Sequence, residues 1–436
     1  MYPLSPPAVY IHEGVMSNDL YRSRAEGVVS ALETPVEPVV YRDADVPDLV
    51  RNGIYDNRKP MGSLAEVRDP ILLFDTFRFD GKEQERMDWT GEQLRDAGTN
   101  AGLSLVGGGA FNWACYNLKD DPSRNDKVCR PCWRIHMQQG CVHRCHYCGL
   151  GGLLVSMVNI EEYCVQLGRL MVRHPWQYTY LLDDDADPPC LEPELGCLGP
   201  LIEYFGTLEN RYVIIHTKTW NTEWMRYLQH NGNTIIVWSI SGDSQSRALE
   251  AKTGTTQERI EAARIAEEAG YQIRYKFKPI IPVKTWREDA SEAVRLLFEK
   301  TNPDVISLCM FMWMDVDEMK SRLGANLLDP TFLQAAEDSR DEVEDTRAKP
   351  FPHWVRAQVY SHYLAEIRKW NSEVPVSLST ENFRMWAEFT DQLGMKPTNY
   401  VCGCGPQSTP GAKLLQDHAF KVAVRNDAGL IPGVYG

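Results

Sequence analysis

The chain has 436 residues, 43% hydrophobic and 24% charged, which is the composition of a globular protein large enough to bury a substantial core. Its net charge of −14 argues against a general affinity for nucleic acid, although it does not exclude a local basic groove. No apolar run approaches the ~18 residues that span a bilayer. The first residues lack the basic and apolar regions of a signal peptide, so we expect a cytoplasmic protein with no membrane partner.

Residues 1–128 are rich in proline, glycine and charged side chains, and we expect them to form an N-terminal extension. Its clearest apolar strand candidate covers residues 71–74. The run Gly107-Gly108-Gly109 is typical of a turn rather than of a phosphate loop, because no Lys-Ser or Lys-Thr pair follows it.

The segment 129–318 alternates strand and helix patterns. Strands are predicted at about 133–138, 177–183, 211–218, 233–240, 271–281 and 303–311, and helices at about 159–173, 195–206, 221–229, 255–269 and 287–300. This alternation predicts an α/β fold with parallel strands and right-handed crossover helices. Six repeats indicate a partial (β/α)6 TIM-like barrel, in which reactive groups gather at the carboxyl ends of the strands.

Two further segments follow the barrel. Residues 319–350 are predicted to be an acidic linker, since much of the negative charge lies in 337–345. Residues 351–436 are predicted to be a C-terminal extension that completes or caps the barrel, with a helix near 353–370 and a strand near 374–379. That strand would bring Glu381 and Arg384 toward a substrate. Tryptophans near predicted strand ends could stack a planar group, although packing is the better default for most of them; they are Trp220, Trp224, Trp238, Trp313 and Trp386.

Three cysteines lie within eight residues, Cys141-Val-His-Arg-Cys145-His-Tyr-Cys148, just after the first predicted barrel strand. Clustered thiolates suit zinc or an iron-sulfur centre better than hard cations. Twelve cysteines in a cytosolic chain also favour metal or catalytic use over disulfides. Because no fourth cysteine or histidine follows at close spacing, one metal position is left open. A zinc knuckle that uses His143 or His146, or simply reduced thiols, are the alternatives.

This triple, with the aromatic Tyr147 before the last cysteine, resembles the signature of the radical S-adenosylmethionine (SAM) superfamily. The resemblance implies a 4Fe-4S cluster on Cys141, Cys145 and Cys148 whose open iron chelates SAM. An electron from the cluster would then cleave SAM into methionine and a 5'-deoxyadenosyl radical. Such an enzyme needs an electron donor, for example flavodoxin or ferredoxin.

A closer resemblance, between about residues 140 and 300, is to spore photoproduct lyase and its relatives. It is carried in order by the segments 216–219 (HTKT), 228–234 (LQHNGNT), 237–240 (VWSI), 255–263 (TTQERIEAA), 270–271 (GY) and 279–280 (PI). The resemblance implies that Lys218 and Ser239 contact SAM. Glu250 and Arg259 also match family positions, where a buried ion pair or a helix cap competes with substrate contact.

The chain departs from photoproduct lyases at two positions. The family resemblance implies a hydrogen-donating cysteine near the end of the second strand and a tyrosine directly after the third cluster cysteine. Here acids stand in the place of that cysteine, and Gly149 follows Cys148. Cys190 could substitute for the cysteine only if its loop is rearranged.

The acids form the run Asp183-Asp184-Asp185-Ala186-Asp187. At the end of a barrel strand, such acids could hold the SAM amino group, for which we name Asp183 and Asp185 beside Tyr147, or take part in proton transfer, for which we name Asp184. They could also bind a cationic substrate. The competing interpretation is an exposed acidic turn before Pro188-Pro189.

Two further cysteine pairs are Cys129 with Cys132 and Cys402 with Cys404. Together they could form a second four-thiolate site, either an auxiliary cluster or zinc. Independent thiols are the alternative, and a third option is that one of them, such as Cys404, donates the hydrogen atom.

The sequence therefore predicts a radical SAM enzyme, a lyase or transferase, that acts on an unidentified small organic substrate. The departures and the negative charge favour a metabolite. The alternatives are a nucleotide or nucleic-acid lyase like spore photoproduct lyase and, from another class, a zinc-binding scaffold protein.

Overall fold

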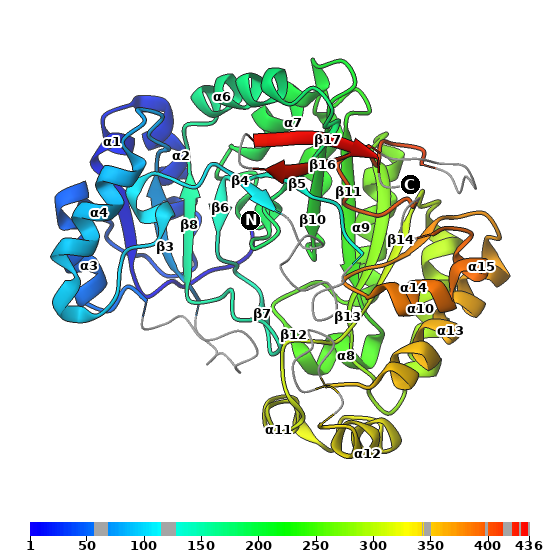
Figure 1. Cartoon of the computed structure of the whole chain (residues 1–436). Helices are drawn as coiled ribbons and strands as arrows, with labels where there is room; N and C mark the ends of the chain where they lie inside the picture. The colour runs from blue at the N-terminus through cyan, green and yellow to red at the C-terminus, as the bar shows by residue number, and fades with distance from the viewer. Residues whose placement is uncertain are drawn as a thin grey trace.

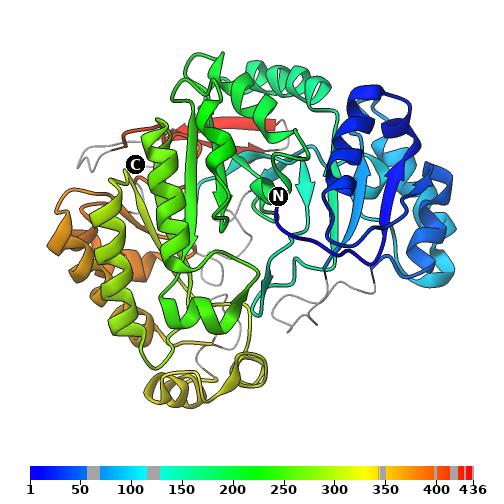
Figure 2. The same ribbon diagram turned by 180° about the vertical axis from the view of Figure 1, so that it is seen from behind.

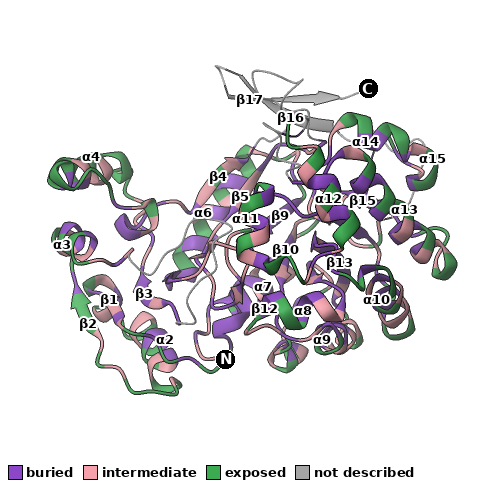
Figure 3. Ribbon diagram, turned by 90° about the horizontal axis from the view of Figure 1, so that it is seen from below, coloured by how far each residue is buried: buried purple, intermediate pink, exposed green. Residues whose placement is uncertain are grey.

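The structure is a computed structural model that describes residues 1–55, 69–114, 128–341, 343, 350–396, 400–412, 421–426 and 429–434. Its two largest sheets are mostly parallel and lie side by side, with helices packed over them (Figure 1, and from behind in Figure 2). Buried residues lie along the strands and on parts of the helices (Figure 3). No helix within the described ranges has the length and apolarity needed to cross a bilayer.

The larger sheet contains the six strands that the sequence predicts for the barrel. Its strands are β4 (Phe111–Ala114), β5 (Cys132–Ile135), β9 (Thr179–Leu182), β10 (Tyr212–Thr217), β11 (Thr234–Ile240), β13 (Gln272–Ile280), β14 (Ile306–Met310) and β15 (Val376–Leu378). The spatial order is β15-β14-β13-β11-β10-β9-β5-β4, and every pair from β15 to β5 is parallel. The edge strands β4 and β15 do not pair with each other in the described part of the chain, so the barrel is partial, as predicted.

The helices around this sheet confirm most of the predicted alternation. They are α6 (Ile160–Arg173), α7 (Leu198–Gly206), α8 (Asp243–Leu249), α9 (Thr256–Glu268) and α10 (Trp286–Lys300). The segment 221–229 differs, because it holds only a short 3-10 helix, Glu223–Tyr227, in which Met225 is the one buried residue. A single buried side chain cannot supply the apolar stripe that stabilises an amphipathic α-helix.

The N-terminal region builds the second sheet together with strands from beyond residue 128. Its strands, in spatial order, are β2 (Val39–Tyr41), β1 (Val9–His12), β3 (Ile71–Asp75), β8 (Leu153–Met157) and β6 (Gln138–Gln139). Its helices are α1 (Glu13–Met16), α2 (Asp19–Ser30), α3 (Val46–Arg51) and α4 (Glu83–Gln93). The domain boundary predicted at residue 128 thus separates strands of one sheet. Strands β1, β2 and β3 lie before it, whereas β6 and β8 lie after it, and β8 begins only a few residues after the cysteine triple.

The C-terminal region contains the predicted helix, α13 (His353–Trp370), and the predicted strand, β15. The remaining elements are α11 (Val316–Met319), α12 (Pro330–Asp338), α14 (Phe383–Glu388), α15 (Thr390–Leu393), β16 (Lys421–Asn426) and β17 (Gly429–Val434). The segment predicted as an acidic linker is therefore partly helical, because α12 buries Phe332 and its neighbours Ala335 and Ala336. Of the acidic run 337–345, residues 342, 344 and 345 lie outside the described residues.

The loop at residues 400–409 closes the floor of the barrel, at the amino ends of the strands. The backbone N–H groups of Tyr178 and Thr179, at the start of β9, donate to the Pro406 carbonyl at 2.9 Å. Arg274, near the start of β13, donates to the Gly403 carbonyl at 3.2 Å and forms an ion pair with Asp304 at 2.7 Å. The C-terminal region therefore supplies the floor of the cavity described below.

Candidate active site

A cavity of about 470 Å³ occupies the barrel, and the cysteine triple lies on its wall. Its lining also includes Lys218, Ser239, Tyr147, Asp184 and Asp185 among the predicted site residues. The structure thus brings most of the predicted site together at the carboxyl ends of the strands, where parallel α/β folds place their ligands.

The three cysteines fit an iron-sulfur cluster better than a single zinc ion. Thiolates around one zinc, with bonds of about 2.3 Å, lie about 3.8 Å apart. The sulfur atoms of Cys141, Cys145 and Cys148 do not all lie within 4.8 Å of one another, as expected for ligands of separate irons. The His143 N–H donates to Cys141 Sγ at 3.4 Å, a contact of the kind that tunes cluster thiolates. Burial raises the pKa of Cys145 to about 12, so ionising the thiol requires a cationic partner.

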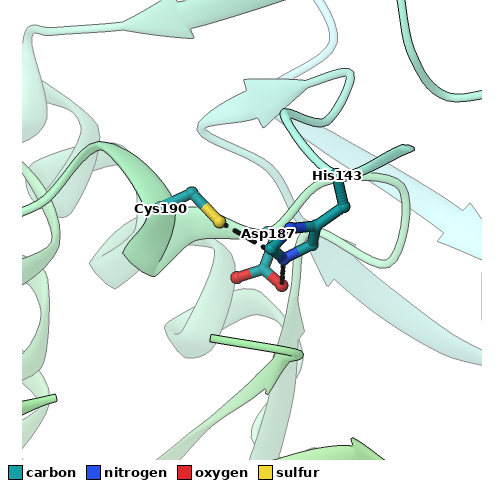
Figure 4. A group of neighbouring side chains, drawn as sticks. All are labelled: His143, Asp187 and Cys190. Atoms are coloured by element: carbon teal, nitrogen blue, oxygen red, sulfur yellow. Dashed lines mark hydrogen bonds and ion pairs between the residues drawn. The ribbon is translucent and has the colours of Figure 1, made fainter. Parts of the chain in front are cut away.

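The cysteine loop is fastened to the barrel through Asp187 (Figure 4). Asp187 Oδ2 lies 2.8 Å from His143 Nε2 and accepts from the Lys218 N–H at 2.7 Å. Asp187 Oδ1 accepts from Thr217 Oγ1 at 2.7 Å. Burial alone would raise the pKa of Asp187, but the His143 ring and these hydrogen bonds outweigh burial and lower it. One buried carboxylate therefore joins the cysteine loop to the end of β10.

His143 cannot complete a zinc knuckle in this arrangement. Its Nδ1 donates to the Lys252 carbonyl at 2.5 Å, and its Nε2 contacts Asp187 at 2.8 Å and Cys190 Sγ at 3.4 Å. Both ring nitrogens of His143 thus already have partners. His143 is therefore not available as the fourth ligand of a zinc knuckle.

A second buried carboxylate, Glu250, holds the other side of the loop. Strand β7 (Arg144–Cys145) pairs with β12 (Glu250–Ala251), so that Glu250 stands opposite Cys145. Glu250 accepts from the Tyr147 hydroxyl at 2.6 Å and from Lys218 Nζ at 3.2 Å, and it pairs with Arg259 at 2.6 Å. Burial alone would raise the pKa of Glu250, but the charges of Lys218 and Arg259 outweigh burial and lower that pKa below its usual value. Of the alternatives left open for Glu250 and Arg259, the structure has the buried ion pair.

The predicted SAM contacts differ in how they are placed. Ser239 and Lys218 both face the cavity. The Tyr147 hydroxyl is already used by Glu250, so Tyr147 acts on the cavity through its ring and through Glu250. Lys218 Nζ lies 6.0 Å from the centre of that ring.

The acidic run points in several directions. Asp183 is fully buried and accepts from the backbone N–H groups of Met137 and Gln138 at 3.1 Å, so it is a structural anchor and not a SAM contact. Burial raises the pKa of Asp183 to about 6. Asp184 lines the cavity in an ion pair with Arg134, and Asp185 lines it with its Oδ1 buried 3.7 Å from His136 Nδ1. Asp184 and Asp185 are therefore the acids that a ligand can reach.

Several other predicted residues lie elsewhere. Cys190 is 1% exposed, faces His143 and is absent from the cavity lining, so its placement gives it no access to a substrate. Glu381 is also buried, where it accepts from Tyr360 Oη at 2.8 Å and pairs with Arg356 at 3.0 Å. Arg384 is exposed outside the cavity. The expectation that Glu381 and Arg384 reach the substrate is wrong, because α13 takes the Glu381 carboxylate into its own packing.

The two outlying cysteine pairs converge on the barrel floor. Arg130, between Cys129 and Cys132, donates to the Tyr400 carbonyl at 2.6 Å, which joins the two segments. Cys129, Cys402 and Cys404 line the cavity, whereas Cys132 is buried in β5. The hydrogen bond between the Cys402 and Cys404 thiols raises the pKa of Cys402 and lowers that of Cys404.

Basic side chains on the cavity wall are what sequence reasoning missed. Arg134, His216, Lys276 and Lys278 all line the cavity. The signal was present in β13, where Arg274, Lys276 and Lys278 alternate along an otherwise apolar strand and so share one face.

Comparison with known proteins supports the family resemblance. The family model "Spore photoproduct lyase" matches residues 125–314. Among curated proteins, spore photoproduct lyase of Bacillus subtilis is 29% identical over 175 residues, which is 38% of this chain and 50% of the relative. That of Clostridium acetobutylicum is 25% identical over 183 residues, or 40% and 54%. The chain resembles spore photoproduct lyase. The matches span about half the length of these curated relatives.

Solved structures of spore photoproduct lyase share the fold over a longer stretch. The complex with a dinucleoside spore photoproduct aligns with a TM-score of 0.59 at 16% identity, over 86% of this chain and 98% of that chain. A variant with bound AdoMet, which is SAM, and the same dinucleoside aligns with a TM-score of 0.57 over the same shares. The fold predicted from the sequence is thereby confirmed.

The departures from spore photoproduct lyase now have positions in space. Gly149, which follows the third cluster cysteine, brings no side chain toward the cavity. Asp184 stands on the cavity wall in the acidic run, and its partner is Arg134.

The Asp187→Asn variant tests the anchoring of the cysteine loop. The substitution replaces one carboxylate oxygen by a donor that faces other donors, so we expect iron to be lost about tenfold more readily to a chelator. Anaerobically reconstituted protein is challenged with a chelator, and the remaining iron is measured. Asp184→Asn, in the same acidic run but outside the anchor, is the matched control and should retain its iron. Equal retention by the two variants would contradict the anchoring role.

Proposed function

We propose that this protein is a radical SAM enzyme of the spore photoproduct lyase type. The observation that supports this most is that Cys141, Cys145 and Cys148 share one cavity with Lys218 and Ser239, in a fold like that of spore photoproduct lyase. When bound, a 4Fe-4S cluster would supply the electron that cleaves SAM to methionine and a 5'-deoxyadenosyl radical.

The side chains of this chain take distinct roles in the proposal. The three cysteines hold the cluster, and Lys218 and Ser239 bind the carboxylate and ribose groups of SAM. Asp185, which lines the cavity beside His136, is the acid that we assign to the SAM amino group. Glu250 holds Lys218 and the Tyr147 ring in place.

For the substrate, the comparisons favour the nucleic-acid alternative over the metabolite. The matching family and relatives are named spore photoproduct lyase, and three of the matching structures hold a dinucleoside spore photoproduct. We therefore propose a nucleotide or nucleic-acid lesion as the substrate, and a lyase reaction. A small metabolite is the second candidate. It is favoured by the acids after β9 and by Gly149 after Cys148, where the family resemblance implies a cysteine and a tyrosine. An electron donor such as flavodoxin or ferredoxin, and a cytoplasmic location, belong to the same proposal.

Cleavage of SAM tests the enzyme class. Anaerobically reconstituted protein with dithionite and SAM should release 5'-deoxyadenosine, because the open iron can bind SAM without a substrate present. Cys145→Ala should release none, whereas Cys164→Ala, which removes a buried thiol on α6 outside the cavity, should behave like the wild type. Chromatography of the quenched reaction measures the product. Continued release of 5'-deoxyadenosine by Cys145→Ala would contradict the assignment to the radical SAM class.

Conversion of a lesion tests the substrate class. Reduced protein with SAM and a dinucleoside spore photoproduct should return the undamaged thymidines, and mass spectrometry detects them. If 5'-deoxyadenosine forms while the lesion stays intact, the nucleic-acid proposal fails, and a small metabolite becomes the favoured substrate. If neither forms, the enzyme class fails as well, so the two results are separable.

We also propose that Cys129, Cys132, Cys402 and Cys404 hold a second metal, either an auxiliary cluster or zinc. Convergence of the two pairs on the barrel floor supports it. Cys404 as hydrogen donor is the competing role for one of these thiols, because its side chain lines the cavity.

Metal content tests the second site. Wild-type protein should carry zinc, or iron beyond the about four atoms of one cluster. The Cys402→Ala, Cys404→Ala double variant should lose that extra metal and keep the first cluster. About four irons and no zinc in both proteins would rule the second site out.

A further inference from the structure

The cavity wall carries more positive charge than the described carboxylates neutralise. Along β13, Arg274, Lys276 and Lys278 face the interior, because alternate residues of a strand share one face. Arg274 is matched by Asp304 at 2.7 Å. Lys276 and Lys278 both line the cavity, and within the described part of the chain no carboxylate lies within 4.0 Å of either ammonium.

The acids that share this cavity are already engaged elsewhere or lie on other elements. Asp184 pairs with Arg134, Asp187 is held by His143 and Thr217, and Asp185 Oδ1 lies 3.7 Å from His136 Nδ1. Cys404 is a further acidic group near the lysines. Lys276 and Lys278 are therefore without a carboxylate partner among the described residues.

Burial makes these unmatched charges expensive. Lys276 is only 7% exposed. Burial and the neighbouring Lys276 charge both lower the pKa of Lys278. A buried charge without a partner destabilises the folded state, so a protein retains such a charge where it serves binding or catalysis.

His216 adds an unpaired polar atom beside the two lysines. It lines the cavity, and its Nε2 is buried without a hydrogen-bond partner. Burial and the nearby lysines lower the pKa of His216, so the ring is neutral and offers a single N–H to a ligand. The register of the sheet places Lys276 between Ser239 and Ser307, whose hydroxyls are further donors at the same level.

Trp313 forms an aromatic edge next to this group. Its backbone has φ of 88°, a conformation that bulky residues rarely adopt, and its side chain lines the cavity. Lys278 Nζ lies 5.7 Å from the centre of the ring. Strained residues of this kind gather at ligand sites, where the cost of the conformation is offset by positioning.

We propose that Lys276, Lys278 and His216 bind a phosphate or carboxylate group of the substrate, with Trp313 against its planar part. The inference rests on the proposed function only in that the cavity is where the substrate meets SAM. It narrows the substrate to an anionic compound. A nucleotide lesion would supply the anion as a phosphate, and a metabolite would supply it as a phosphate or a carboxylate.

The test uses reconstituted protein with SAM and two probes, inorganic phosphate and succinate. Calorimetry measures binding to the wild type and to the Lys276→Met, Lys278→Met double variant. We expect at least one probe to bind the wild type, and the double variant to bind it about tenfold or more weakly, since two charge-assisted contacts are lost. Lys284→Met, which removes an exposed lysine after the same strand, should bind like the wild type. Preference for phosphate or for succinate distinguishes the two sources.

Two further readouts keep the result interpretable. The double variant should melt at the same or a higher temperature than the wild type, because methionine removes unpaired buried charges, and it should keep its iron and its release of 5'-deoxyadenosine without substrate. Absence of binding by the wild type, equal binding by the double variant, or loss of SAM binding in that variant would overturn the proposal. Failure of the wild type to release 5'-deoxyadenosine would instead contradict the proposed enzyme class, whatever the probes show.

Discussion

The buried Asp187 carboxylate is the contact on which the candidate site depends. It gathers His143 from the cysteine loop and Thr217 and Lys218 from the end of β10. The loop that bears the three cysteines has little regular structure of its own, apart from the two-residue pairing of β7 with β12. Hydrogen bonds to a charged group contribute roughly 1.5–3 kcal/mol each, so the His143 contact adds to the backbone hydrogen bonds that Cys141 and His146 donate to the Leu150 and Leu249 carbonyls. A cysteine triple held in this way keeps one side open to the cavity.

The sequence predicts helices and strands correctly where the hydrophobic periodicity continues. It does not predict the direction of a side chain where that periodicity breaks. Strand β13 and helix α13 lie where alternation and the amphipathic pattern predict them. Asp183 follows β9 directly, so its carboxylate was predicted to face SAM. Its φ of 45° interrupts the alternation and turns the carboxylate back to the Met137 and Gln138 amides. Cys190 likewise depends on a loop whose path no local pattern specifies.

The cavity also differs in charge from the impression that the whole chain gives. A net charge of −14 argues against a general affinity for nucleic acid, yet the barrel interior presents Lys276 and Lys278 without carboxylate partners among the described residues. The overall charge reflects exposed side chains, whereas ligand recognition depends on the few groups that face the cavity. The chain thus combines a fold like that of spore photoproduct lyase with Asp184, Lys276 and Lys278 on its cavity wall.

The most direct test of the central claim is electron paramagnetic resonance of the reconstituted, dithionite-reduced protein before and after addition of SAM. A three-cysteine cluster with an open iron facing the cavity predicts a reduced 4Fe-4S signal whose g values shift when SAM binds that iron. A signal that SAM leaves unchanged, or no iron-sulfur signal at all, would contradict the account.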